Sequence, residues 1–298
     1  MNVTMSTASG HISSKIIPQL LNEGVNVTVI SRHPEKSQDL KRRGVKIVEG
    51  SLEDPKVVQR ACKDADVLFW MTPQKLDAED VDSYMQQLAH NAVKAIDTNK
   101  VKRVVNLSSL GAEQHSGLGL VSGLGEVEEI LNGSTAAITH FRPAMFMENF
   151  ETQIPNIAAE GKIYMAFDGG KPVPQIATED IADAMVNRIL DRDWTGRQVQ
   201  ELHGAEDISF RDSARIIGQE LGRELQYVEV SPDEMRRELL QHGASPSMSE
   251  KYLEMFDGIN HGRSKRLMAR TPQSTTQTRF ADFARERFVP SLRDRRIM

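Results

Sequence analysis

The chain has 298 residues, 39% of them hydrophobic and 27% charged, with a formal net charge of −5 at pH 7. A chain of this size suits one large α/β domain or two unequal ones, and its charge argues against broad electrostatic capture of nucleic acid. Cys62 is the only cysteine, no apolar run reaches the ~20 residues that span a bilayer, and the amino terminus lacks a signal-peptide pattern, so we expect a cytoplasmic protein.

The first predicted unit is a strand, a turn and a helix around residues 4–13. A Rossmann turn has the spacing G-x-x-G-x-x-G, because glycine permits a tight turn, close approach of the backbone to a pyrophosphate and close packing of helix on strand. Thr7, Gly10 and Ser13 occupy those three places, so one glycine of three remains. An ordinary strand, turn and helix could carry the same residues. Pro18 is expected to end or kink the helix unless the helix begins later.

Short β-rich runs alternate with helical runs through the rest of the first half. Asp54 before Pro55 is typical of a helix start, and Gly24 and Gly44 stand where a helix should end and a strand begin. Because parallel strands need crossovers, and helices are compact crossovers, the alternation predicts a doubly wound parallel sheet with helices on both faces. The predicted strands are 25–30, 45–48, 67–70, 101–107 and 138–142, and the predicted helices are 34–43, 55–62, 80–98 and 126–131.

After Arg142 and Pro143 the alternation stops. Residues 161–174 are rich in glycine and proline and predict loops with short strands, and Thr178 is expected to cap a helix that runs to Leu190. The remainder predicts helices at 210–221, 232–242, 249–262 and 280–288, with a strand at 227–230. We therefore expect a Rossmann unit over 1–150, with returning segments within 176–203, and a smaller, mainly helical lobe over 151–298. The basic runs 265–270 and 293–296 are expected to be solvated surface.

Several short motifs follow one another along nearly the whole chain. They are Thr7-Ala-Ser-Gly-His-Ile-Ser13, Ser31-Arg32 with Pro34-Glu-Lys36, Gly50-Ser-Leu-Glu-Asp-Pro55, Thr72-Pro73, and the stretches 101–112, 125–128, 142–149 and 230–234. Each motif is weak alone. In this order they resemble the NmrA-like family of atypical short-chain dehydrogenase/reductases, whose first turn reads G-A-T-G-x-x-G. The resemblance implies a Rossmann fold that binds NAD(P)(H).

Physical chemistry assigns parts of such a cofactor to particular residues. A pyrophosphate would sit against the N–H groups of Gly10, His11 and Ile12 at a helix N-terminus. Arg32 follows the second strand, where a guanidinium can hold a 2′-phosphate bidentately, and Lys36 is a second cation. With no acidic residue at that point, we expect NADP(H) rather than NAD(H). The expected cofactor-binding residues are Thr7, Ser9, Gly10, His11, Ile12, Arg32, Lys36, Ser51, Leu52, Met71, Thr72, Pro73, Ser108, Pro143 and Phe146.

Three residues of this expected pocket depart from the family pattern. Thr7 places a β-branched side chain where glycine leaves room for the phosphate. Ser13 replaces the packing glycine, which is a milder change. Ser51 replaces an aspartate that, in the family, commonly lies near the adenine. These departures bring the affinity for a dinucleotide into question.

The pattern predicts no catalytic residue. A typical short-chain reductase pairs a tyrosine with a lysine four residues on, and none of Tyr84, Tyr164, Tyr227 and Tyr252 has that lysine. Ser108 and Ser109 stand near the usual catalytic serine, but such a pair can equally cap a loop.

Other polar and apolar candidates near the expected site have ordinary interpretations. Glu126, Glu128 and Glu129 are expected to face solvent or to complement the dipole of a helix, and the histidines lack a metal-ligand spacing. Met145, Phe146 and Met147 would approach the nicotinamide by resemblance, or else pack between the lobes.

Three functions agree with these features, each with a small-molecule cleft outside the carboxyl ends of the strands where the lobes meet. The first is an NADPH-dependent oxidoreductase in which the nicotinamide passes hydride directly to a conjugated or quinone-like acceptor. The second is a regulator that senses the cofactor and acts through a protein partner. The third is a member that has lost redox chemistry. The missing Tyr and Lys pair favours the last two.

Overall fold

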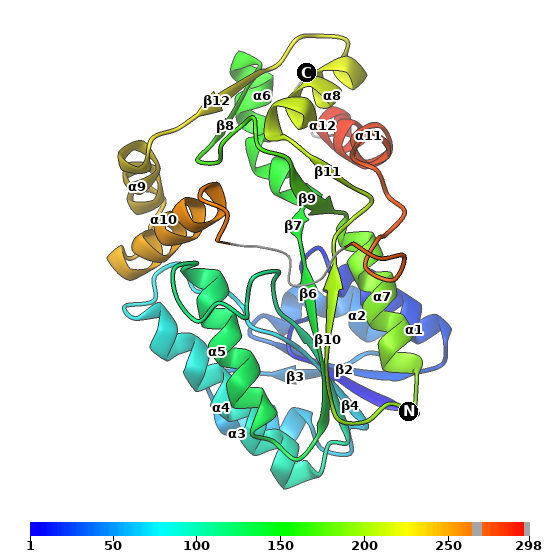
Figure 1. Ribbon diagram of the computed structural model, residues 1–298. Helices are drawn as coiled ribbons and strands as arrows, with labels where there is room; N and C mark the ends of the chain where they lie inside the picture. The colour runs from blue at the N-terminus through cyan, green and yellow to red at the C-terminus, as the bar shows by residue number, and fades with distance from the viewer. Residues whose placement is uncertain (264–269, 295–298) are drawn as a thin grey trace.

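The computed structural model describes residues 1–263 and 270–294, and its centre is a sheet of seven parallel strands (Figure 1). The order across the sheet is β10-β6-β5-β4-β1-β2-β3. Because β1 pairs with β2 on one side and with β4 on the other, the strand order reverses at β1, and the predicted doubly wound Rossmann sheet is confirmed. The strands are β1 (Asn2–Met5), β2 (Asn26–Ser31), β3 (Lys46–Glu49), β4 (Val67–Met71), β5 (Arg103–Leu107), β6 (Ala137–Pro143) and β10 (Arg197–Leu202).

Helices cover both faces of this sheet. One face carries α3 (Pro55–Ala61), α4 (Val81–Asn99) and α5 (Leu120–Asn132), and the other carries α1 (Ser13–Asn22) and α7 (Thr178–Leu190) (Figure 1). Successive side chains of β4 point to opposite faces, so Leu68 and Trp70 join the core under α4 whereas Phe69 joins the core under α1. The strand is apolar along its length because both of its faces are buried. The short α2 (Gln38–Arg42) follows a 3₁₀ turn at Pro34–Ser37.

Two helices differ from the sequence-based expectation. Pro18 lies inside α1 without ending it, because Ile16, Ile17 and Leu20 are fully buried and their packing offsets the one backbone hydrogen bond that proline removes. The helix expected at 126–131 begins six residues earlier, at Leu120. A Cβ on Gly125 would lie 2.0 Å from the carbonyl oxygen of Ala112, so this glycine permits close packing of the helix and does not break it.

The remaining elements form a second lobe above the carboxyl edge of the sheet (Figure 1). It holds a three-stranded sheet and a two-stranded sheet, and Phe150, Phe210 and Phe280 pack together in its core. The strands are β7 (Met145–Phe146), β8 (Lys162–Met165), β9 (Val173–Ile176), β11 (Glu206–Ile208) and β12 (Gln226–Glu229). The helices are α6 (Ile154–Glu160), α8 (Phe210–Leu221), α9 (Pro232–Gln241), α10 (Pro246–Asn260), α11 (Phe280–Phe283) and α12 (Val289–Asp294), with 3₁₀ helix Met147–Gln153 and π-helix Ala284–Phe288.

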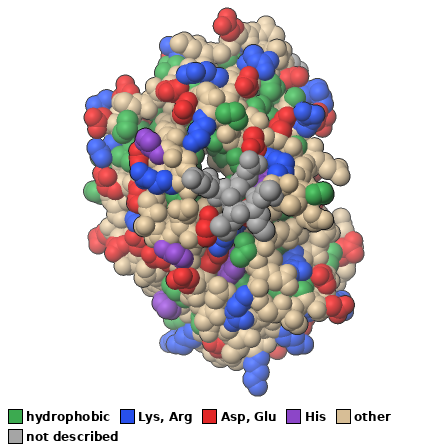
Figure 2. Space-filling view, in the orientation of Figure 1, with side chains coloured by type: hydrophobic (Ala, Val, Ile, Leu, Met, Phe, Trp, Pro, Cys, Tyr) green, Lys and Arg blue, Asp and Glu red, His purple; other side chains and the backbone are tan. Residues whose placement is uncertain are grey.

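Two segments of the second half contact the Rossmann sheet. The chain returns through α7 to β10, which pairs with β6 at the sheet edge. Helix α10 is bonded to both lobes: at its middle Tyr252 donates to Gln74 and Lys251 pairs with Asp82, and at its end Asn260 donates to the carbonyl of Ala166. No helix in 1–263 or 270–294 is long and apolar enough to cross a membrane. Acidic and basic side chains are interspersed over the face in Figure 2. Residues 265–269 and 295–296 of the two basic runs lie outside the described residues.

Candidate functional site

The residues expected to bind a cofactor are all placed at one edge of the sheet. Because the strands are parallel, their carboxyl ends meet at this edge. The edge lies where the strand order reverses, which is the usual ligand position in such folds. Residues 7–12 follow β1, Arg32 and Lys36 follow β2, Ser51 and Leu52 follow β3, Met71 ends β4 and Thr72 and Pro73 follow it, Ser108 follows β5, Pro143 ends β6, and Phe146 lies in β7 of the second lobe.

The turn between β1 and α1 presents unpaired donors. Helix α1 begins at Ser13 without a side-chain cap, and its first turn carries no acid. Within residues 1–263 and 270–294, the N–H groups of residues 7–12 donate no hydrogen bond. Gly10 has φ +105°, and nothing lies within 4 Å of the place a Cβ would occupy. An uncapped helix N-terminus with room above it fits a pyrophosphate.

The departures from the glycine pattern contact one another at this turn. Thr7 is half-buried, Ser13 is fully buried, and their hydroxyl oxygens are 2.8 Å apart. Ser6, which the sequence analysis did not select, joins the turn to β4: its hydroxyl accepts from the N–H of Met71 and donates to the carbonyl of the same residue, each at 2.9 Å. Ser6 could have been found as the first polar residue after β1.

Two exposed cations mark the end of β2. Arg32 and Lys36 are both exposed, and neither side chain has a hydrogen-bond or ion-pair partner in the described part of the chain. Ser51, which replaces the family's aspartate, has a partner within its own loop: its hydroxyl accepts from the N–H of Glu53 at 3.2 Å. The next residue, Leu52, is buried in the core. The two free cations fit a phosphate, whereas Ser51 and Leu52 chiefly shape their loop.

The ends of β5 and β6 present a different kind of surface. Ser108 is buried, and its hydroxyl has no hydrogen-bond partner among the described residues. An unsatisfied buried hydroxyl at a ligand edge fits contact with a bound molecule. Phe146 is half-buried against the core under α1, whereas Met147 is fully buried in the core of the second lobe. Met147 therefore packs in the protein interior, which was the alternative to an approach to the nicotinamide.

The phenols are engaged elsewhere. Tyr164 on β8 donates to Glu160 at 2.7 Å, Tyr227 on β12 donates to the carbonyl of Phe167 at 2.8 Å, and Tyr252 on α10 donates to Gln74 at 2.8 Å. Tyr84 lies on α4. None of the four lies on α5, the helix that follows β5.

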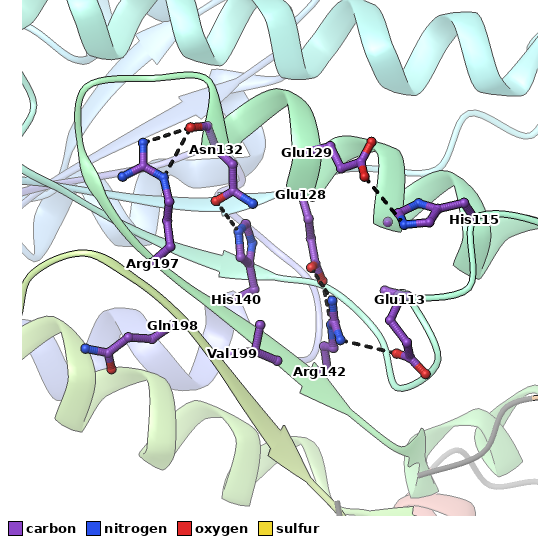
Figure 3. A pocket seen from close by; sticks show the side chains of 12 residues that line it. Glu113, His115, Glu128, Glu129, Asn132, His140, Arg142, Arg197, Gln198 and Val199 are labelled. Atoms are coloured by element: carbon purple, nitrogen blue, oxygen red, sulfur yellow. Dashed lines mark hydrogen bonds and ion pairs between the residues drawn. The ribbon is translucent and has the colours of Figure 1, made fainter. Parts of the chain in front are cut away.

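The expectation that Glu128 faces solvent is wrong. Glu128 lies on α5 and is 4% exposed, and its carboxylate accepts two hydrogen bonds from Arg142, at 2.9 and 2.6 Å (Figure 3). Arg142 also reaches Glu113 at 3.2 Å. Arg142 is itself buried on the face of β6 that α5 covers, and a buried guanidinium requires a buried carboxylate. Glu129 is exposed as expected, and Glu126, which accepts from Gln86, is partly exposed.

His140 neighbours this ion pair beside a polar cavity of about 250 Å³ (Figure 3). Its Nδ1 lies 3.0 Å from the amide nitrogen of Asn106, and its Nε2 lies 3.1 Å from the amide oxygen of Asn132. A neutral imidazole that accepts at Nδ1 and donates at Nε2 satisfies both bonds. Burial lowers the pKa of His140 to about 4, which keeps it neutral.

The N-terminus of α7 differs from the prediction that Thr178 caps it. The residue before the helix is Ala177, and Thr178 is the first helical residue. Its N–H donates to both carboxylate oxygens of Glu148 at 3.0 Å, and its hydroxyl donates to the same carboxylate. A carboxylate 30 residues away thus caps the helix, which local sequence could not indicate. Glu148 also lines a cavity of about 580 Å³ between the lobes that extends to His11 and Lys15 of the first turn.

Comparison with known proteins agrees with this geometry. A family model described as NAD(P)H-binding matches residues 7–192. An NAD(P)H azoreductase of Xenophilus azovorans is 25% identical over 248 residues, which cover 83% of this chain and 84% of that protein.

Two solved structures show the same fold. An NADPH-dependent quinone oxidoreductase from Escherichia coli, complexed with NADPH, superposes with a TM-score of 0.76 at 20% identity and covers 96% of this chain and 99% of its own. Nmra, a negative transcriptional regulator in complex with NAD, superposes with a TM-score of 0.74 at 16% identity. The match covers 99% of this chain and 97% of that protein. The chain therefore belongs to the NAD(P)H-binding family, and the Rossmann fold that its resemblance to NmrA-like proteins implied is confirmed.

Proposed function

We propose that the protein is an NADPH-dependent oxidoreductase that reduces a small conjugated or quinone-like acceptor. The observation that carries this proposal is the uncapped N-terminus of α1, whose turn offers N–H groups without partners in the described residues, together with two cations after β2, Arg32 and Lys36, that have none there either. Phosphate is the group that such a surface binds best. The names of an azoreductase and a quinone oxidoreductase among similar proteins support the acceptor class.

Each part of the site has a defined task in this proposal. The turn at residues 7–12 binds the pyrophosphate, Arg32 and Lys36 hold the 2′-phosphate, and the hydroxyl of Ser108 donates a hydrogen bond at the far end of the edge. A bound nicotinamide supplies a hydride. The protein orients the two reactants and excludes water, and no tyrosine serves as an acid.

The lobes divide the work in the same proposal. Residues 1–150, with returning segments within 176–203, form the dinucleotide-binding unit, and 151–298 forms the lobe that contacts the acceptor in the cleft between them. The returning β10 supports this division, because it extends the Rossmann sheet beyond β6. The single cysteine, Cys62, supports action in the reducing cytoplasm.

Calorimetric titration of the full chain with NADPH, NADP⁺, NADH and NAD⁺ in parallel tests the cofactor. We expect NADPH to bind more tightly than NADH, because only NADPH carries the 2′-phosphate. Consumption of NADPH with a panel of quinones then tests turnover. If none of the four nucleotides binds, the proposal is wrong and the third function, without redox chemistry, replaces it.

A cofactor-sensing regulator is the second candidate. It is favoured by two observations: the phenols of Tyr164, Tyr227 and Tyr252 are all committed to other partners, and a negative transcriptional regulator bound to NAD has the same fold. Binding of NADPH without turnover on any quinone would support this candidate. A protein partner would then be found by comparing complexes formed with NADPH and with NADP⁺.

A further inference from the structure

An ion pair joins two loops at the adenosine end of the candidate site. Glu53 lies in the loop after β3 and Lys75 in the loop after β4, with the Lys75 Nζ 3.5 Å from the Glu53 Oε2. Each side chain is a little more than one third exposed, at 37% and 36%. Glu53 is an acid that the sequence pattern did not single out, and it follows β3, the strand next to the one that precedes Arg32.

The sheet order gives this pair an unusual position. Strands β4 and β3 are separated by β1 and β2, so their carboxyl ends lie three strand spacings apart, about 14 Å. The two loops must therefore lean toward each other for the side chains to meet. In the sheet, β1 and β2, which precede the pyrophosphate turn and Arg32, lie between the strands that precede these two loops.

Other contacts fix both members of the pair. The side-chain amide of Asn91 donates to the carbonyls of Leu52 at 2.9 Å and Glu53 at 3.1 Å, which holds the first loop against α4. The ammonium of Lys75 lies 5.4 Å from the ring centroid of Tyr84, within the range of a cation–π contact. Ser245, which precedes α10, donates to the carbonyls of Leu76 and Ala78 and so holds the second loop.

The same cluster includes the charge of Arg32. The pKa of the Tyr84 phenol is raised chiefly by burial and then by Glu53, and the charge of Arg32 opposes this shift. Arg32 and Glu53 therefore both act on Tyr84. The charged groups around Tyr84 thus include the cations Arg32 and Lys75 and the carboxylates Glu53 and Asp77.

We propose that the Glu53–Lys75 pair is a second determinant of cofactor selectivity, which lets the site accept a 2′-phosphate although an acid lies beside it. This inference rests on the proposed function. A phosphate monoester carries nearly two negative charges at neutral pH, and an unpaired carboxylate nearby repels it. Lys75 cancels the charge of Glu53, so the attraction of Arg32 and Lys36 prevails.

Two ligands that differ only in the 2′-phosphate test this inference. Adenosine 2′,5′-bisphosphate and adenosine 5′-monophosphate are titrated calorimetrically into the full chain, its Lys75→Met and Glu53→Gln variants, and the double variant. One nearby charge, screened by water and salt, changes the affinity for a phosphate by about threefold to fivefold. We expect Lys75→Met to weaken the bisphosphate by that factor, Glu53→Gln to strengthen it similarly, and the double variant to return near wild type. The monophosphate should change little.

Lys46→Met is the matched control, because Lys46 is exposed and begins β3 at the opposite edge of the sheet. It removes the same charge and should leave both affinities unchanged. A pair that merely holds the loops would shift both ligands equally, which overturns the inference. So does an unchanged ratio of the two affinities in both single variants, while the proposed function stands. If the wild type binds neither ligand, the proposed function fails as well.

Discussion

The hydroxyl oxygens of Thr7 and Ser13 lie 2.8 Å apart, at two positions where the related turn carries glycine. The two departures are thus partners: one residue follows β1 and the other opens α1. The bond ties the start of the turn to the helix that a phosphate would approach. The turn gains a link between its ends and loses some of the room that glycine provides.

Thr7→Gly should separate these two effects. We expect the free energy of unfolding to fall by about 1 to 2 kcal/mol, because a buried hydroxyl loses its partner and glycine adds unfolded-state entropy. Affinity for NADPH should rise, since a Cβ leaves the phosphate approach. Thermal unfolding and calorimetry measure the two quantities, and Thr7→Ser, which keeps the hydroxyl, is the control. Weaker or unchanged binding in a folded variant would show that the turn does not meet a phosphate.

Arg32→Ala tests the hold on the 2′-phosphate. Loss of a hydrogen bond to a charged group should weaken NADPH binding by about 1.5 to 3 kcal/mol and leave NADH binding nearly unchanged. Both are measured by titration. Arg43→Ala, an exposed residue at the end of α2, is the control. Equal losses for both cofactors would contradict the assignment.

Any reductase activity should survive removal of each phenol. Tyr84→Phe, Tyr164→Phe, Tyr227→Phe and Tyr252→Phe should keep most of the turnover, whereas loss of a true general acid costs about 10²- to 10⁴-fold. A primary isotope effect with deuterated NADPH should appear if hydride transfer limits the rate. Collapse of turnover in one variant that still binds cofactor would identify that tyrosine as the acid.

Glu128→Gln should destabilise the protein strongly. Among the described residues, the variant leaves the buried Arg142 with Glu113 as its remaining ion-pair partner, and breaking a buried pair typically costs about 3 to 5 kcal/mol. Urea unfolding measures the loss. Glu129→Gln, one residue along and exposed, should change stability by less than about 0.5 kcal/mol. Similar stability in the two variants would mean that the pair is not essential to the fold.

His140 should contribute to acid sensitivity. Its pKa is lowered by burial from 6.5 to about 4, so the unfolded chain binds a proton at higher pH than the folded chain. The stability from this residue is therefore complete above pH 6.5 and is lost as the pH falls from 6.5 toward 4, by up to about 3 kcal/mol. Urea unfolding of wild type and His140→Gln at pH 7 and pH 4.5 should show a smaller acid loss in the variant. His90→Gln, exposed on α4, should follow wild type.

Most of the Rossmann sheet could be predicted because its strands are continuous apolar runs and its helices carry local signals. Asp54, for example, caps α3 as its place before Pro55 indicates. The failures involve residues whose role depends on distant partners. Gly125 is helical because Ala112 lies against it, Glu128 is buried because Arg142 faces it, and Thr178 is capped by Glu148.

The candidate site divides in the same way. Gly10 and Arg32 could be chosen from their distance to a predicted strand end. The pair of Glu53 and Lys75 could not, because it joins loops that the strand order alone brings near each other. The contact of Thr7 with Ser13 could not be predicted either, because the absence of two glycines from the motif does not show that the residues replacing them touch.

Helix α10 sets the spacing of the two lobes by its own length. It has 15 residues, about 22 Å; Ser245, just before its first residue, is bonded to the loop after β4, and Asn260 at its end is bonded to the second lobe. The lobes cannot hinge apart unless those bonds break or the loop that carries Gln74 and Lys75 moves with the helix. A larger or smaller acceptor must therefore be accommodated by side-chain rearrangement within a gap of fixed width. Displacement of the second lobe would also move the loop after β4 at the adenosine end of the site.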